Sequence, residues 1–493
     1  MWSGRAKSAR RFRDDLFIIV ALVVLVWAII TCVRASQYSS WDFVAFWGAG
    51  KALNLGLDPY QPGTWQGFGV PAGFYSPIFL AEIFQPIAAL LPNAMKAKLI
   101  WTGFNIVAGA ALSLILVRVS GLRVNFRSFA IAVALLVAFE PFTGVMQLGQ
   151  TDIMVVLAVA ISWLLIEYRR YFLAGLIFCL GASNPHLILG IGVYYLYRAI
   201  FRREWTLLLG LIAGGLAFIA SSAVYLNYTI EWVTQVLPPK QAIAATELIQ
   251  VTIIHLVNYY GSSLGWTNAR LLKVGELLTV AVTLVTLVAA VMIWRRVKGR
   301  SMAIEMGAAV VLTVMSTTFA YHQDLMLLTL IAPSLVAMWR DTHSVEKVGY
   351  LATCASTFLF SALVGFVGYG QYEYRQLFFF VAPFLAGVLL LTQLRASQTE
   401  MLRVIPWAIA AAVLSIAGDL LPTLVSIKLV ETEITLVLLG LLGYLLGIWR
   451  WYGGPTPVRD EREDERQEDY SPERQQDVWQ VATVKRATVT RPR

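Results

Sequence analysis

Asp42 is the residue of this chain whose type and position are best suited to catalytic chemistry. It follows closely after the apolar run 16–33 and lies in the aromatic-rich stretch 40–50. A carboxylate just beyond a membrane boundary can act as a general base toward a hydroxyl group at the lipid–water interface. The structural alternative is that Asp42 only caps a helix that begins at Phe43. Asp42 is therefore the first candidate for a catalytic residue.

Further polar residues fall where the apolar pattern places helix ends on the same side of the membrane as Asp42. They are Gln150, Asp152, Asn184, His186 and His322. Polar and ionisable groups beside apolar spans are energetically costly, which makes these residues candidates for substrate binding. Structural alternatives exist: a helix cap for Gln150, a kink satisfied by neighbouring helices at Asn184, and a solvated loop position for His322.

The composition is typical of a membrane protein. Of the 493 residues, 58% are hydrophobic and only 14% are charged, and the mean hydropathy is +0.66. Soluble domains are about half apolar and about a quarter charged. The net charge is +9, but Lys and Arg stand in short clusters between apolar runs, as the charges that set membrane topology do. We therefore expect membrane lipids as partners and no nucleic acid.

The apolar runs predict an all-α, polytopic membrane protein of about 12 to 14 transmembrane helices. The run 77–91 is short and contains Glu82 and Pro86, which favours an interfacial or re-entrant helix over a span. If the N-terminus lies inside, the short inner loops contain more Lys and Arg residues than the outer loops do, as expected for a membrane protein. After the first run 16–33, the predicted spans are 99–117, 129–146, 153–166, 172–183, 187–197, 207–226, 271–294, 303–320, 325–339, 348–367, 377–394, 404–420 and 434–449.

The same pattern divides the chain into three parts. Residues 1–15 are predicted to be a cytoplasmic N-terminus, and residues 16–450 a membrane domain with outer loops at about 34–98 and 227–269. Residues 453–493 are rich in charged residues, Gln and Pro and poor in apolar ones. We expect this last part to be a disordered cytoplasmic tail.

Six short segments, in order, resemble glycosyltransferase family 87. They are Asp42-Phe-Val-Ala-Phe, Gly56-Leu-Asp-Pro-Tyr60, Phe74-Tyr-Ser-Pro77, Gln85-Pro-Ile-Ala-Ala-Leu-Leu-Pro92, Leu148-Gly-Gln-Thr-Asp152 and Asn184-Pro-His186. The resemblance covers roughly residues 42–333. It implies a membrane domain of the GT-C type, with juxtamembrane helices in the first outer loop and an essential carboxylate early in that loop, where this chain has Asp42.

The resemblance also implies an activity. The enzyme would transfer a hexose, with mannose the first candidate, from a polyprenyl-phosphate sugar to a lipid or glycan acceptor at the extracytoplasmic face of the cell membrane. Asp42 would be the general base and the anomeric centre would be inverted. The leaving phosphate needs hydrogen-bond donors, for which His322 and His186 are the best placed, with Lys240 or Arg375 as alternatives. The expected substrate-binding residues are His322, His186, Asn184, Gln150, Asp152 and Tyr75.

No cofactor is expected besides the donor substrate, and no metal, because the sequence has no Asp-x-Asp pair beside Asp42 and no His-rich ligand spacing. The chain has Asn184-Pro185 where the family often has Lys-Pro, a difference that bears on the identity of the donor. Two other functions fit the apolar pattern: a lipid or glycan transporter or flippase, and a polymerase or ligase of surface glycans. A transporter does not explain the long first outer loop with its early carboxylate.

Overall fold

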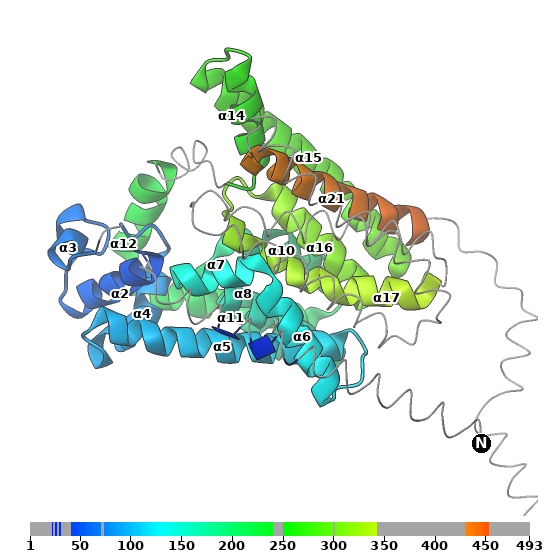
Figure 1. Ribbon diagram of the computed structural model, residues 1–493, viewed down its shortest axis with the longest axis horizontal. Coiled ribbons are helices and arrows are strands. Elements are labelled where there is room, and N and C mark those ends of the chain that lie inside the picture. Colours follow the sequence, from blue (N-terminus) through cyan, green and yellow to red (C-terminus); the bar gives the residue numbers. More distant parts are fainter. Residues whose placement is uncertain are drawn as a thin grey trace, which may run out of the picture.

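A computed structural model describes residues 41–70, 73–239, 250–298, 301–342 and 429–452, together with isolated positions between 22 and 30. These residues form helices and no strand, apart from one isolated bridge between Gln250 and Tyr321 (Figure 1). The predicted all-α class is thus confirmed. The predicted spans 348–367, 377–394 and 404–420, most of the run 16–33, Lys240, Arg375 and the tail 453–493 lie outside the described residues.

The helices follow one another with short connections. Their bounds are α2 (Trp41–Asn54), α3 (Pro62–Gly67), α4 (Ile78–Leu90), α5 (Ala94–Val119), α6 (Phe126–Ala138), α7 (Glu140–Leu148), α8 (Asp152–Glu167), α9 (Tyr171–Phe178), η1 (Cys179–Ser183), η2 (Pro185–Leu187), α10 (Leu189–Phe201), α11 (Trp205–Ala223), α12 (Leu226–Glu231), η3 (Trp232–Val236), α14 (Ile253–Ser263), α15 (Asn268–Val297), α16 (Met302–Ser316), η4 (His322–Ile331), α17 (Ala332–Thr342) and α21 (Leu429–Tyr452).

Three of these helices, α5, α11 and α15, are long and apolar enough to cross a membrane, within the part of the chain that is described. A fourth span results if α6 and α7 are counted together. The apolar helix α4 has 13 residues and contains Pro86. At about 1.5 Å per residue it is too short for a hydrocarbon core of about 30 Å, in agreement with its prediction as something other than a span.

The prediction of one continuous helix over 129–146 is wrong. The chain forms α6 and α7 instead, and their axes differ by 68°. Phe139 between them has an extended backbone, with φ −81° and ψ 113°. Pro141 explains the break, because its ring has no N–H to donate and clashes with the carbonyl group four residues earlier.

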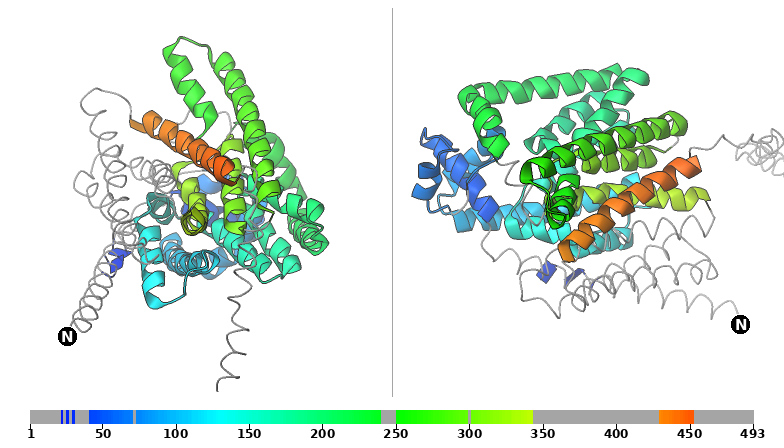
Figure 2. Two further views of the ribbon diagram at one scale, coloured as in Figure 1. Left: turned by 90° about the vertical axis from the view of Figure 1, so that its right-hand side faces the viewer. Right: turned by 90° about the horizontal axis from the view of Figure 1, so that it is seen from above.

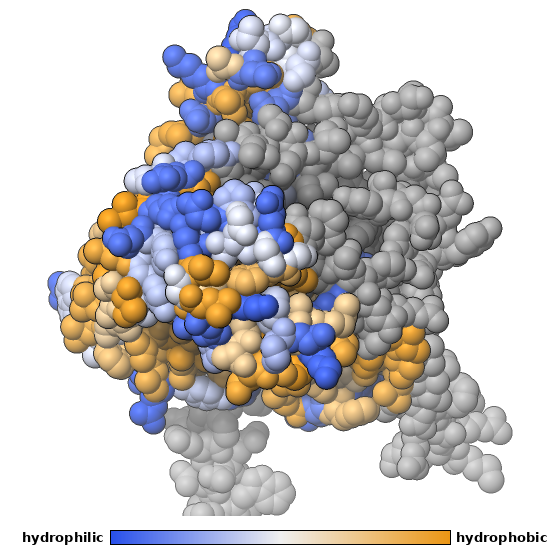
Figure 3. Space-filling model, turned by 90° about the vertical axis from the view of Figure 1, so that its left-hand side faces the viewer, coloured by the Kyte–Doolittle hydropathy of each residue, from blue (hydrophilic) through white to orange (hydrophobic). Residues whose placement is uncertain are grey.

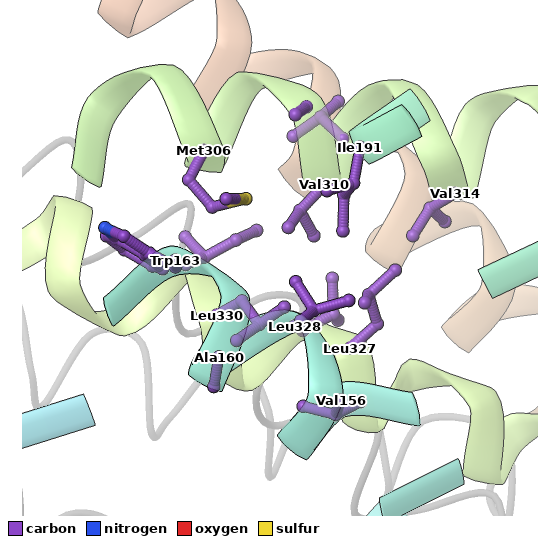
Figure 4. Close-up of a cluster of buried hydrophobic side chains, with 14 of the residues drawn as sticks. Val156, Ala160, Trp163, Ile191, Met306, Val310, Val314, Leu327, Leu328 and Leu330 are labelled. Atoms are coloured by element: carbon purple, nitrogen blue, oxygen red, sulfur yellow. The ribbon is translucent and has the colours of Figure 1, made fainter. Parts of the chain in front are cut away.

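The main hydrophobic core lies between α8, α10, α16 and η4 (Figure 4). Trp163, Ile191, Val310 and Leu328 are all buried there. The backbones of α10 and α16 approach so closely that a Cβ atom on Gly190 would lie 2.4 Å from the backbone nitrogen of Thr313. Because α10 and α16 are in close contact, η2, which precedes α10, and η4, which follows α16, lie at neighbouring ends of these two helices.

A second core belongs to the first predicted outer loop, where α2, α3 and α4 confirm the expected helices. Phe43, Phe84 and Trp101 form a buried aromatic cluster. A Cβ atom on Gly50 would lie 2.5 Å from the backbone of Phe84, so α2 and α4 cross in close contact. Together with α12, these helices gather at one end of the molecule (Figures 1 and 2), and they place the start of α2 against the bundle.

A buried ion network joins α10, α15 and α16 at the other end of the bundle. Glu305, which is 0% exposed, accepts hydrogen bonds from Arg202 at 2.5 and 2.9 Å and from the hydroxyl group of Tyr194 at 2.7 Å. Arg198 pairs with Glu204 at 2.6 Å. These charges are satisfied by each other, as buried charges must be.

Candidate functional site

Three aspartates converge at the end of the bundle that α2, α3 and α4 cover (Figure 1). Asp42 lies in the first turn of α2, Asp152 is the first residue of α8, and Asp324 lies in the first turn of η4. Asp152 is 0% exposed and Asp324 is 5% exposed, whereas Asp42 is half-buried. The charges of Asp42 and Asp324 both act on the carboxyl group of Asp152. The chain thus places three acidic groups from distant segments in one site.

Gln150 holds the carboxylate of Asp42. Its Nε2 donates a hydrogen bond of 2.8 Å to Oδ2 of Asp42. Gly149 makes this approach possible, because it ends α7 in a left-handed conformation, and a Cβ atom there would lie 2.5 Å from Cβ of Phe43. The indole of Trp101 donates to the carbonyl oxygen of Gly149 at 3.0 Å and fixes the turn. The turn between α7 and α8 is therefore built to pack against the start of α2.

The segment from Asn184 to His186 interrupts the helices α9 and α10 and supplies two further hydrogen bonds. Nδ2 of Asn184 donates to Oδ1 of Asp152 at 2.8 Å. Nε2 of His186 lies 3.1 Å from Oδ2 of Asp324, and the imidazole packs edge-on against the ring of Phe319. The kink that the proline predicts is present, and the acidic side chains beside it satisfy its polar groups.

Asp152 differs from an ordinary aspartate in its protonation. It stands just before the predicted span 153–166. Burial raises the pKa of its carboxyl group well above the ordinary value, and the neighbouring carboxylates of Asp324 and Asp42 raise it further, against the opposing hydrogen bond from Asn184. The carboxyl group of Asp152 therefore keeps its proton at a pH at which an exposed aspartate is ionised.

The structure brings five of the predicted site residues together: Asp42, Gln150, Asp152, Asn184 and His186. Tyr75 is 45% exposed, and its carbonyl oxygen accepts a hydrogen bond of 2.9 Å from the indole of Trp232, the first residue of η3. His322 begins η4, and its side chain lies outside the part of the chain that is described.

Asp324 is a member of the site that the choice of residues from the sequence missed. It stands two positions after His322, in a turn predicted on the same face as Asp42, and directly before an apolar run. An acidic residue beside an apolar run was the available signal. The histidine of the same turn drew the assignment instead.

The long apolar helices define a helical membrane protein. The cluster of aspartates at one end of its bundle is a site suited to proton transfer. The model of glycosyltransferase family 87 matches residues 74–321. The chain belongs to this family and is a membrane glycosyltransferase, which confirms the resemblance seen in the sequence. A comparison with individual curated proteins gave no match. The matched range includes the segments of Gln150, Asp152 and His186, with Asp42 before it and Asp324 just after it.

Proposed function

We propose that this glycosyltransferase moves a hexose, mannose first among the candidates, from a polyprenyl-phosphate sugar to a lipid or glycan acceptor at the extracytoplasmic face of the cell membrane. The observation that carries the proposal is the carboxylate of Asp42, half-buried at the end of the bundle beside α2 and held by Gln150 at 2.8 Å. A base in this position meets both a donor whose lipid lies among the helices and an acceptor at the interface.

The distribution of charge supports the outer placement. His186 precedes α10, and Arg198 and Arg202 stand at its far end. Glu305 lies in the first turn of α16, and Asp324 follows that helix. The carboxylate site and the buried ion network with Arg198 and Arg202 thus occupy opposite ends of the same two helices, and Arg residues favour the cytoplasmic side.

Seen from the end that carries α2, α3 and α12, hydrophilic residues gather over the middle of the face, and hydrophobic residues lie along its left and lower margins (Figure 3). A polar centre with an apolar margin suits an enzyme whose substrates have a polar head group and a lipid tail. This view supports the placement of both substrates at this end of the bundle.

The chemistry is one displacement. Asp42 takes the proton of the acceptor hydroxyl group while its oxygen forms a bond to the anomeric carbon of the sugar. The bond from that carbon to the phosphate oxygen breaks, and the phosphate leaves with the electron pair. A single displacement inverts the anomeric centre. Hydrogen-bond donors stabilise the charge that grows on the phosphate, and the segment with Asn184 and His186, which contacts Asp152 and Asp324, is the candidate to supply them.

The proposal is tested with the purified protein and polyprenyl-phosphate mannose, compared with polyprenyl-phosphate glucose and arabinose, over a panel of lipid acceptors. Transfer of one of these sugars with inversion is the expected result. Efficient transfer of a sugar from a nucleotide donor, or movement of lipid across the membrane without transfer, would refute the proposal.

The orientation predicts which positions react with a membrane-impermeant thiol reagent. In a cysteine-free background of sealed cells, a cysteine replacing the exposed Gln61, between α2 and α3, should be labelled from outside. A cysteine replacing Val124, which is 50% exposed between α5 and α6, should be labelled only after the membrane is opened. Labelling of the Val124 position in intact cells would place the carboxylate site on the cytoplasmic side.

His322 is expected to assist the leaving phosphate. His322→Ala should lower turnover, and His322→Gln should lower it less, because the glutamine amide retains a hydrogen-bond donor. Steady-state kinetics with a saturating acceptor measure the effect. Wild-type kinetics in His322→Ala would make His322 a loop residue without a role in transfer.

A further inference from the structure

The two buried aspartates of the site face each other. Oδ1 of Asp152 accepts the hydrogen bond from Asn184, and no N–H or hydroxyl group among the described residues donates to the buried Oδ2. Besides Asn184, the carboxyl group of Asp152 interacts with the carboxyl group of Asp324. The second oxygen of Asp152 therefore needs a proton of its own to make a hydrogen bond.

Asp324 has the opposite surroundings. Its Oδ2 accepts a hydrogen bond from the backbone N–H of Tyr321 at 2.7 Å and lies 3.1 Å from Nε2 of His186. Two donors favour the ionised form of a carboxyl group, and two buried carboxyl groups in contact cannot both be ionised without a cation between them. The proton through which the two carboxyl groups meet is therefore best placed on the second oxygen of Asp152.

We infer that Asp152 and Asp324 share one proton, and that this carboxyl pair positions the segment from Asn184 to His186 for the donor phosphate. Asp152 fixes the amide of Asn184, which keeps a second N–H for the substrate, and Asp324 fixes the ring of His186 through Nε2. Asp152 and Asp324 are positioning residues that act through their partners. The role toward the phosphate rests on the proposed function, but the shared proton does not.

The shared proton predicts an asymmetry between two conservative substitutions. In Asp152→Asn, the amide oxygen still accepts from Asn184 and the amide N–H donates to Asp324 in place of the proton. In Asp324→Asn, the charge that holds His186 is lost. A merely structural pair of hydrogen bonds gives no reason for one asparagine to be tolerated and the other not.

Kinetics of the purified full-length protein with polyprenyl-phosphate mannose test this asymmetry. Asp152→Asn should keep kcat/KM for the donor within about threefold of wild type, since its hydrogen bonds persist. Asp324→Asn and Asp152→Ala should lower it by about 10- to 100-fold, the effect expected for a hydrogen bond to a charged group. Asp58→Asn is the matched control and should leave it unchanged.

A double mutant tests whether Asp324 acts through His186. Asp324→Asn combined with His186→Gln should be no slower than the slower single variant, because both changes remove the same interaction. Multiplied losses in the double mutant, or equal losses in Asp152→Asn and Asp324→Asn, would overturn the positioning role.

Infrared spectroscopy detects the protonated carboxyl group directly and does not depend on catalytic activity. At neutral pH the difference spectrum of wild type minus Asp152→Asn should contain the carbonyl stretch of a protonated carboxyl group, at higher frequency than carboxylate bands. Only carboxylate bands in that spectrum would refute the shared proton. If wild type transfers no sugar from any polyprenyl-phosphate donor, the proposed function and the role toward the phosphate both fail, and this spectrum alone decides the shared proton.

Discussion

Asp42→Asn is expected to abolish sugar transfer while leaving the protein folded. Asparagine keeps the size of the side chain and an oxygen that accepts the hydrogen bond from Gln150. It cannot take a proton from the acceptor hydroxyl group, and a general base contributes about 10²- to 10⁴-fold to the rate. Turnover of the purified variant, measured beside its thermal unfolding in detergent, separates the loss of the base from a loss of the fold.

Asp58→Asn provides the control for Asp42→Asn. Asp58 lies in the same predicted outer loop, and its Oδ1 accepts a hydrogen bond of 2.9 Å from the backbone N–H of Tyr60 in a local turn. Asparagine forms the same turn, so transfer should stay near the wild-type rate. Turnover of Asp42→Asn above roughly a tenth of wild type would remove Asp42 from the role of base.

Arg202→Ala is expected to have the largest effect on stability. It leaves Glu305 at 0% exposure without the cation that pairs with both of its carboxylate oxygens. Removal of one partner of a buried ion pair costs about 3 to 5 kcal/mol, because the remaining charge stays buried. The midpoint of thermal unfolding in detergent should fall markedly.

Arg296→Ala is the matched control, because Arg296 lies on the exposed face near the end of α15. A surface substitution of this kind changes stability by about 0.5 kcal/mol or less. Equal unfolding midpoints for Arg202→Ala and Arg296→Ala would show that the buried network does not stabilise the bundle.

Hydrophobic pattern predicted the helices well where a long run had no interruption. The predicted span 99–117 lies within α5, and 271–294 lies within α15. The break between α6 and α7 escaped the pattern, because the hydropathy of 129–146 is continuous while Pro141 acts on hydrogen bonding and not on hydropathy.

The members of the site were easier to predict than their pairing. Asp42 and Gln150 are 108 positions apart, and the sequence placed both on the same side of the membrane without predicting the hydrogen bond between them. The contact of Arg202 with Glu305 spans 103 positions and was not predicted, since each residue alone is a charge near a helix end. The contact between Arg202 and Glu305 depends on how α10 packs against α16 at Gly190. A local sequence pattern does not predict such packing between distant segments.

The choice of donor in sealed proteoliposomes is the most direct test of the central claim, that Asp42 serves a transfer from a polyprenyl-phosphate sugar. The protein is reconstituted with a lipid acceptor and offered the same radiolabelled sugar either on polyprenyl phosphate or on a nucleotide. We predict that label reaches the acceptor from the polyprenyl-phosphate sugar with wild type and not with Asp42→Asn. Label that reaches the acceptor from the nucleotide sugar alone, or equally with both proteins, would contradict the claim.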